Sequence, residues 1–339
     1  MKTLNAIAAL VLAGTLFGCG KKNSDIVKPA NTGANSYVAD QVTIYSGVST
    51  NGAGSVVNGT LAQARYSYPN GIIIDKSGNL YVSEYFANDI RKITPDGTVS
   101  TYASGISHPG YLAMDTLGNL YVPTDYYLAK VAPNGVVING ALDAKVTCLV
   151  NNNGTLFAAT ANQVFMQNAA GEFALLAGNG AAGSADAKMG DEATFNSIVS
   201  MAADPSGNLF VMDYGNGIRV INPATTEVKT FPLKTTQTPF GYPQAMAVDQ
   251  WDNIYVVNDG DNDNNGNPNY GNGYIIKITP DGTVTNFAGN RLLANNVLEG
   301  PAQSVELDAP NGIVLLPSGD FLVTSIDDII LKITTHKQQ

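Results

Sequence analysis

A short pattern, a two-residue turn followed by three apolar residues, returns six times along this chain and constrains its fold more than any other feature. Successive copies lie 36 to 67 residues apart. Repetition at such a period is typical of architectures in which each unit buries its apolar face against the next unit. The copies occupy residues 78–82, 118–122, 154–158, 207–211, 252–256 and 319–323.

The first copy shows what one repeat unit contains. Apolar segments at 71–75, 80–83, 90–93 and 98–103 alternate with polar turns, including the tight turn Pro95-Asp96-Gly97. Glycine and asparagine accept the positive φ that such turns require. Four antiparallel strands per unit, six units and no helical periodicity predict an all-β fold, a six-bladed β-propeller.

The residues of the first unit also carry a family resemblance. The stretch from Pro69-Asn70-Gly71-Ile72 through Gly78-Asn79-Leu80-Tyr81-Val82 to Ile90-Arg91-Lys92-Ile93 resembles an NHL repeat. The resemblance covers roughly residues 41–334 and is weaker in the third and sixth copies, and the sixth has Leu316 in place of the turn aspartate. It implies an NHL-type propeller with six blades.

The two ends of the chain are expected to share one blade. The sixth copy stops near His336 with three strands, while residues 42–47 look like a fourth strand without a unit of its own. We predict that residues 42–45 pair with the C-terminal strand, because an open sheet edge would invite aggregation.

The N-terminus has the features of an export signal. A basic start precedes an apolar run at 6–17, which is too short to span a bilayer. Leu16-Phe17-Gly18-Cys19 resembles the lipobox of bacterial lipoproteins, which implies cleavage after Gly18 and acylation of Cys19. A plain secretory leader is the alternative. We therefore expect a signal peptide at 1–18, a flexible tether at 19–40 and a propeller at 41–335. The resemblance implies an exported lipoprotein anchored in the outer membrane.

Composition excludes several function classes. The chain of 339 residues has 18 lysines and arginines against 28 acidic residues, a formal net charge of −10. Nucleic-acid binding needs a basic face, so it is disfavoured. Two cysteines rule out a disulfide scaffold, and two histidines rule out a site built on three imidazoles. We expect a monomer.

Alignment of the six copies places one residue of each inner strand at the mouth of the central channel. This ring has no carboxylate or imidazole, which argues against a metal enzyme. Three of its amides, those of Asn70, Gln244 and Asn311, could bind a neutral polar ligand, and a water-filled channel without a ligand is the alternative. The ring consists of Asn70, Gly110, Val146, Val199, Gln244 and Asn311.

A second ring follows the second strands and includes Glu84 and Asp213. These acids would be ligands or bases in a functional interpretation. The favoured interpretation is structural, because an acid after a strand commonly accepts backbone N–H groups of the following turn.

An insertion in the fifth copy predicts a calcium site. Asp259, Asp261, Asp263 and Asn265 alternate and are followed by a glycine, as in the first half of an EF-hand-like loop. Asn272 stands where a bidentate glutamate is expected, so calcium binding should be weak. A polar loop without calcium is the alternative.

Aromatic residues follow the second strands of two successive blades. Tyr85, Phe86, Tyr126 and Tyr127 predict a surface patch for a sugar or a protein. His108 precedes Pro109 near the channel mouth, and no nucleophile–histidine–acid order supports a catalytic residue.

Two function classes stay open. The first is a lipid-anchored envelope or cell-surface scaffold that binds a protein or glycan through one propeller face, without catalysis. The second is a calcium-dependent propeller lyase or hydrolase, similar to gluconolactonases or streptogramin lyases.

Overall fold

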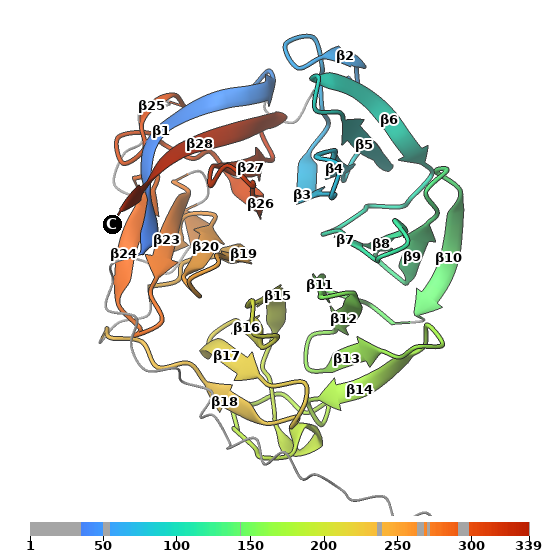
Figure 1. Ribbon diagram of the computed structural model, residues 1–339, viewed down its shortest axis with the longest axis vertical. Helices are drawn as coiled ribbons and strands as arrows, with labels where there is room; N and C mark the ends of the chain where they lie inside the picture. The colour runs from blue at the N-terminus through green and yellow to red at the C-terminus, as the bar shows by residue number, and fades with distance from the viewer. Residues whose placement is uncertain are drawn as a thin grey trace, which may run out of the picture.

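Six β-sheets surround a central axis and form a six-bladed β-propeller (Figure 1). The computed structural model describes residues 35–49, 55–142, 144–235, 239–262, 268–269, 272–290 and 298–338. Each blade has four main antiparallel strands, of which the first lies nearest the axis. The predicted all-β class and blade number are confirmed.

The first three blades follow in chain order. Blade 1 comprises β3 (Pro69–Ile74), β4 (Leu80–Glu84), β5 (Asp89–Ile93) and β6 (Thr98–Ser104), with β2 (Gly59–Thr60) on its outer edge. Blade 2 comprises β7 (Ala113–Met114), β8 (Leu120–Pro123), β9 (Leu128–Val131) and β10 (Val137–Leu142). Blade 3 comprises β11 (Cys148–Asn152), β12 (Thr155–Ala159), β13 (Val164–Gln167) and β14 (Phe173–Ala177).

The last three blades carry the longer connections. A 3₁₀ turn, η1 (Gly190–Glu192), precedes blade 4, which comprises β15 (Ile198–Ala203), β16 (Leu209–Asp213), β17 (Gly217–Ile221) and β18 (Val228–Thr230). Blade 5 comprises β19 (Pro243–Val248), β20 (Ile254–Asn258), β23 (Tyr274–Ile278) and β24 (Val284–Ala288), with the inserted pair β21 (Asp261–Asn262) and β22 (Pro268–Asn269). Blade 6 comprises β26 (Pro310–Leu315), β27 (Phe321–Ser325), β28 (Ile329–Gln338) and β1 (Ser36–Gly47), with β25 (Gly300–Pro301) on its edge.

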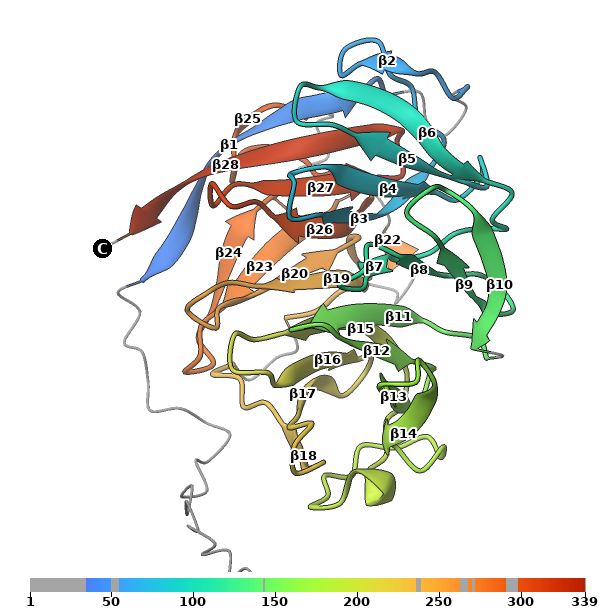
Figure 2. The same cartoon turned by 45° about the vertical axis from the view of Figure 1, so that its right-hand side comes forward.

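The chain ends meet in blade 6, as predicted. β1 pairs antiparallel with β28, and Val42 and Ile44 face Ile333 and Leu331 across the ladder. The two strands lie side by side in both views (Figures 1 and 2). β1 begins at Ser36, so residues 36–40, which the sequence analysis assigned to the tether, belong to the sheet. β28 likewise continues three residues beyond the expected boundary at residue 335.

An aspartate closes the turn between the first and second strands in four blades. In blade 1, Oδ1 of Asp75 accepts hydrogen bonds from the backbone N–H of Ser77 and of Asn79, each at 2.8 Å. Its Oδ2 accepts from Nδ2 of Asn79 at 2.7 Å. This clamp explains why the repeat contains an aspartate and an asparagine four residues apart. Equivalent clamps occur at Asp115, Asp204 and Asp249.

The hydrophobic core consists of six clusters, one between each pair of neighbouring blades. The repeat tyrosines Tyr81, Tyr121 and Tyr255 are buried in these interfaces, as expected. Each blade therefore depends on both neighbours, and the ring needs the seam between β1 and β28 to complete its last blade.

Candidate functional site

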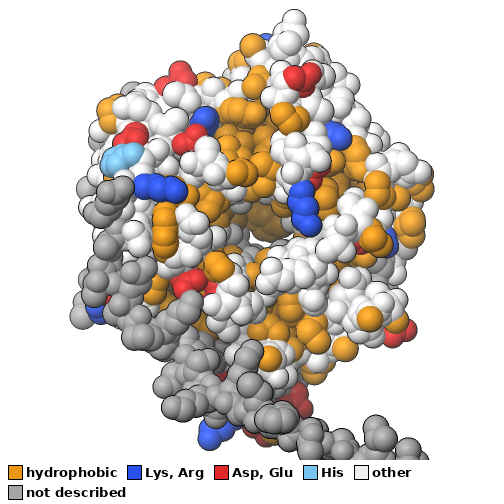
Figure 3. All heavy atoms as spheres, in the orientation of Figure 1, with side chains coloured by type: hydrophobic (Ala, Val, Ile, Leu, Met, Phe, Trp, Pro, Cys, Tyr) orange, Lys and Arg blue, Asp and Glu red, His pale blue; other side chains and the backbone are white. Residues whose placement is uncertain are grey.

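Two cavities lie on the propeller axis, one at each end of the inner strands. We call the first the strand-start pocket; it has a volume of about 450 Å³ and is lined where the inner strands begin. We call the second the strand-end funnel; it has a volume of about 1010 Å³ and is lined by the second halves of the inner strands and the turns that follow. Figure 3 shows the molecule hollowed at its centre, with hydrophobic side chains around the opening.

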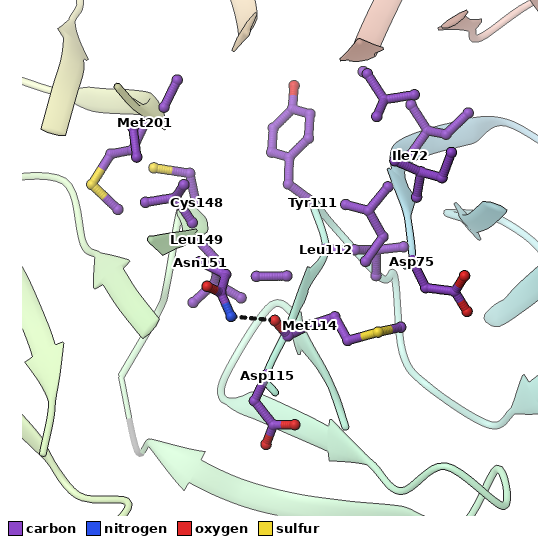
Figure 4. Close-up of a pocket in the computed structure, with 18 of the residues that line it drawn as sticks. Ile72, Asp75, Tyr111, Leu112, Met114, Asp115, Cys148, Leu149, Asn151 and Met201 are labelled. Carbon is purple, nitrogen blue, oxygen red and sulfur yellow. Dashed lines mark hydrogen bonds between the residues drawn. The ribbon is translucent and has the colours of Figure 1, made fainter. Parts of the chain in front are cut away.

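Tyr111 lines both cavities and therefore lies between them. Its hydroxyl donates a hydrogen bond to Oδ1 of Asn311 at 2.6 Å, from the segment that leads into blade 2 to the inner strand of blade 6. Its ring points into the central space in the close-up (Figure 4). Burial raises the pKa of the Tyr111 hydroxyl, so this donor stays protonated.

The strand-start pocket contains five members of the ring identified from the repeats. These are Asn70, Gly110, Val146, Val199 and Gln244. The sixth, Asn311, is 9% exposed and is bound by Tyr111. Oδ1 of Asn70 has no hydrogen-bond partner among the described residues. The amides of Asn70 and Gln244 are therefore the ring members that can bind a polar ligand in this pocket.

A histidine–aspartate pair on the pocket wall was not identified from the sequence. Nδ1 of His108 lies 2.5 Å from Oδ2 of Asp125, and both residues line the pocket. His108 adopts a φ of +44°, which is uncommon for a residue other than glycine, and its N–H is held by Oδ1 of Asn88 at 2.9 Å. Backbone strain of this kind is often found at functional sites. The only sequence signal was the position of His108 before Pro109.

Aromatic rings flank the pocket on two sides. Tyr85 stacks on His108 with ring centroids 4.5 Å apart, and it also contacts Phe86 at 5.3 Å. On the other side, Tyr214 and Tyr242 are stacked at 6.3 Å. Tyr85, Tyr214 and Tyr242 line the pocket. The pocket therefore offers flat apolar surfaces beside hydrogen-bonding groups.

The predicted four-residue aromatic patch is distributed over two places. Tyr85 and Phe86 pack together and are joined by Tyr68, whose ring lies 4.9 Å from that of Phe86. Tyr126 is 75% exposed, whereas Tyr127 packs against the core cluster between blades 1 and 2.

Glu84 and Asp213 line neither cavity. Oε1 of Glu84 accepts from the N–H of Ser67 at 2.9 Å, and Oδ1 of Asp213 accepts from the N–H groups of Asn196 and Ser197. Burial and a hydrogen bond with Asp89 raise the pKa of Glu84 to about 9. Both acids thus hold the chain that enters the inner strand, which favours the structural interpretation over a role as ligand or base.

The calcium prediction concerns residues that the structure describes only in part. Asp259 is 8% exposed, and the backbone of Asp261 lies in β21. Asp263 and Asn265 lie outside the described residues. Within the described part of the chain, no group of three or more histidine, cysteine or acidic side chains could hold a metal ion. Weak calcium binding by this loop stays a prediction.

Cys19 and the leader lie outside the described residues, so acylation also stays a prediction. No helix among the described residues is long and apolar enough to cross a membrane. The second cysteine, Cys148, is 2% exposed, and burial raises the pKa of its thiol to about 12. It is therefore an inert core residue.

No protein-family model and no curated protein matches this chain. Solved structures of similar fold include an auxiliary nutrient binding protein from Bacteroides thetaiotaomicron, with a TM-score of 0.65, 16% identity, and coverage of 90% of this chain and 77% of that one. Virginiamycin B lyase from Staphylococcus aureus gives a TM-score of 0.54 at 15% identity, with 88% and 99% coverage. A gluconolactonase from Xanthomonas campestris gives 0.56 at 12% identity, with 91% and 99% coverage. At these identities the similarity establishes the propeller fold alone.

Proposed function

We propose that this protein is an exported, lipid-anchored NHL-type propeller that binds a carbohydrate in the strand-start pocket. The observation that carries the proposal is a pocket that holds amide side chains between two sets of aromatic rings, Tyr85 with His108 and Tyr214 with Tyr242. A sugar ring has apolar faces that stack on aromatic side chains and hydroxyls that bond to amides. Asn70 and Gln244 supply such amides.

The direction in which the chain leaves the propeller supports this choice of face. Nδ2 of Asn253 donates to the carbonyl of Asn35 at 3.3 Å, and Asn253 lies in the turn after β19, at the funnel end of the blade. The described chain therefore begins at the funnel end of blade 5, at the end of the axis opposite the strand-start pocket. Two nutrient-binding proteins among the similar structures agree with a binding role.

The test is glycan binding by the soluble chain that begins at residue 35. We expect binding to at least one oligosaccharide class on an array, weakened roughly tenfold or more by Tyr85→Ala and by Gln244→Ala, since each removes one recognition element. Met189→Ala is the matched control, because Met189 is exposed and lines neither cavity. Absence of any glycan binding by the folded chain would refute the proposal.

The lipid anchor is tested separately on protein expressed in a bacterial host. Mass spectrometry of the mature N-terminus should show an acylated Cys19, and Cys19→Ala should release the protein from the membrane fraction. A mature N-terminus at a residue other than Cys19, without acylation, would favour the plain secretory leader.

A second candidate function is a lyase or hydrolase, and the His108–Asp125 pair is the observation that favours it. A histidine oriented by a carboxylate is the usual form of a general base. The similarity to a lyase and a gluconolactonase agrees with this candidate. Turnover of a bound glycan or lactone that His108→Ala abolishes while binding persists would establish it, and assays with and without calcium would decide whether the metal is needed.

A further inference from the structure

The most exposed aromatic side chains of the protein gather around the mouth of the strand-start pocket. Among the described residues these are Phe86, Tyr126 and Tyr214, which are 55%, 75% and 37% exposed. Each follows the second strand of its blade, at the end of the axis where the inner strands begin. Tyr214 lines the pocket, and the residue before each of the other two lines it as well. Exposed aromatic rings therefore mark one face of the propeller, around one cavity.

Phe86 and Tyr214 stand on opposite sides of this mouth. Phe86 belongs to the loop between β4 and β5 of blade 1, and Tyr214 to the loop between β16 and β17 of blade 4. These blades are three positions apart in a ring of six, so they face each other across the axis (Figure 1). The amides of Asn70 and Gln244 line the pocket between them. A ligand that contacts both rings must therefore pass over the hydrogen-bonding groups of the pocket.

The exposed ring of Phe86 is held in place by other rings. Its centroid lies 4.9 Å from that of Tyr68 and 5.3 Å from that of Tyr85. Tyr68 adopts a φ of +59°, which is uncommon for a bulky residue, and its N–H donates to Oδ1 of Asp328 at 2.8 Å. A ring that already packs against two neighbours loses little freedom when a ligand stacks on it. Tyr126, by contrast, has no ring packed on it among the described residues.

The pocket alone holds only a short sugar. Its volume of about 450 Å³ lies in the lower half of the range for small-molecule sites, and Phe86 is not part of its lining. Contact with Phe86 therefore requires a ligand that extends beyond the pocket. Stacking uses the flat apolar faces of sugar rings. Rings joined through equatorial bonds, as in β-1,4-linked glucose, form a straight chain that presents these faces along its length, whereas an α-1,4-linked chain curls.

The charges of the pocket lining are balanced. Among the described lining residues, Asp125 and Lys145 carry opposite charges, and Nδ1 of His108 lies 2.5 Å from Oδ2 of Asp125. A uronate chain would need an excess of positive charge at its binding site. The lining therefore favours a neutral chain.

We propose, on the basis of the carbohydrate binding proposed above, that the ligand is an internal segment of a neutral β-1,4-linked glucan chain. The chain crosses the mouth of the strand-start pocket from Tyr214 to Phe86. The sugar units over the axis bond to Asn70 and Gln244, and the outer units stack on the two rings. Phe86 thus determines the length of chain that the protein recognises.

Calorimetric titration of the soluble chain that begins at residue 35 tests this assignment. We expect cellohexaose to bind at least about tenfold more tightly than cellobiose, and more tightly than the curled maltohexaose. Phe86→Ala should weaken cellohexaose binding roughly tenfold and leave cellobiose binding unchanged, whereas Phe86→Trp should keep both. Tyr126→Ala is the matched control, because it removes an exposed ring of the same face that lies in another blade, and it should bind cellohexaose as the wild type does.

Recognition of an internal segment has its own readout. Hydroxyethylcellulose is a long polymer with few ends, so its presence in a native gel should retard the wild type and retard Phe86→Ala less. A polymer that does not retard a protein able to bind cellohexaose would overturn the proposal, because the pocket would then hold only a chain end.

Three further outcomes would also overturn the proposal: equal affinity for cellobiose and cellohexaose, equal affinity for cellohexaose and maltohexaose, or equal effects of Phe86→Ala and Tyr126→Ala. Binding of another glycan on the array without binding of cellohexaose would overturn the β-1,4-glucan assignment alone. A folded chain that binds no glycan would refute carbohydrate binding as well.

Discussion

The fully buried Arg91 donates a hydrogen bond from Nη1 to Oε2 of the fully buried Glu84 at 3.2 Å. Arg91 also donates to the carbonyls of Arg65 at 2.9 Å and Val57 at 3.0 Å, which belong to the connector before blade 1. The buried arginine therefore fastens a long connector to the blade that follows it.

Blade 4 repeats this arrangement with other residues. Arg219 lies 3.5 Å from Asp213 and donates to the carbonyls of Thr194 at 3.0 Å and Ala185 at 2.9 Å. In blade 6 the position that corresponds to the arginine holds Leu331, which is fully buried. A buried arginine thus binds the connector before blade 1 and the connector before blade 4, whereas blade 6 has a buried leucine at the same position.

We expect Arg219→Leu to lower the free energy of unfolding by about 3–5 kcal/mol, because it leaves Asp213 buried without its cation. The double variant Arg219→Leu/Asp213→Ser, which copies the residues of blade 6, should recover at least about 1 kcal/mol of this loss. Urea unfolding followed by circular dichroism measures both. A double variant no more stable than the single one would show that the connector bonds, rather than the lone charge, determine the loss.

The stability of blade 1 should depend on pH through Glu84. Its pKa is raised from 4.5 to about 9 by burial and by the hydrogen bond with Asp89, so the folded state holds a proton that the unfolded state releases. This contribution is complete below pH 4.5 and is lost as the pH rises toward 9. Urea unfolding at pH 6 and pH 9 should therefore show lower stability at pH 9. Glu84→Gln mimics the protonated acid, so the drop in unfolding free energy between pH 6 and pH 9 should be smaller in this variant than in the wild type. An equal drop in both proteins would contradict the assignment to Glu84.

Removal of the seam strand should destabilise the whole ring. A chain that begins at Ser49 lacks β1 and exposes the edge of β28, so we expect a lower melting temperature and concentration-dependent aggregation. A chain that begins at residue 35 keeps β1 and should melt as the mature protein does. Equal melting of the two chains would mean that the seam does not contribute to stability.

Loss of one turn clamp should have a local and moderate cost. Asp204→Ala removes the acceptor for the N–H and the side-chain amide of Asn208, both at 2.8 Å. We expect a loss of about 1–3 kcal/mol in the free energy of unfolding. Ser318→Ala in the blade 6 turn, where Leu316 replaces the clamp, is the control and should cost less. Hydrogen exchange at Asn208 distinguishes local opening from global unfolding.

The strands of each blade and the seam between the two chain ends could be predicted from local sequence patterns. The spacing of apolar residues and turn signals predicted four strands per blade, because strand alternation and turn chemistry depend on neighbours in sequence. The unpaired segment at 42–45 predicted the seam, since a propeller cannot leave one blade incomplete. The start of β1 at Ser36 was missed because residues 36–40 become a strand only through pairing with the extended end of β28.

The candidate site could be predicted only in part. Alignment of the repeats placed Asn70 and Gln244 at the channel mouth, and both line the strand-start pocket. The pairing of His108 with Asp125 was not predicted, because the residues stand on different segments and each alone resembles an ordinary loop residue.

The sequence by itself determined the number of blades, the strands within each blade and the blade that the two ends share, because these depend on a pattern that repeats along the chain. Only the tertiary structure decided that Tyr111 lies between two cavities on the axis, that Arg91 and Arg219 fasten the connectors, and that Tyr85, Tyr214 and Tyr242 gather around the strand-start pocket. These features arise between residues of different blades and connectors, and ring closure alone brings those residues within contact distance.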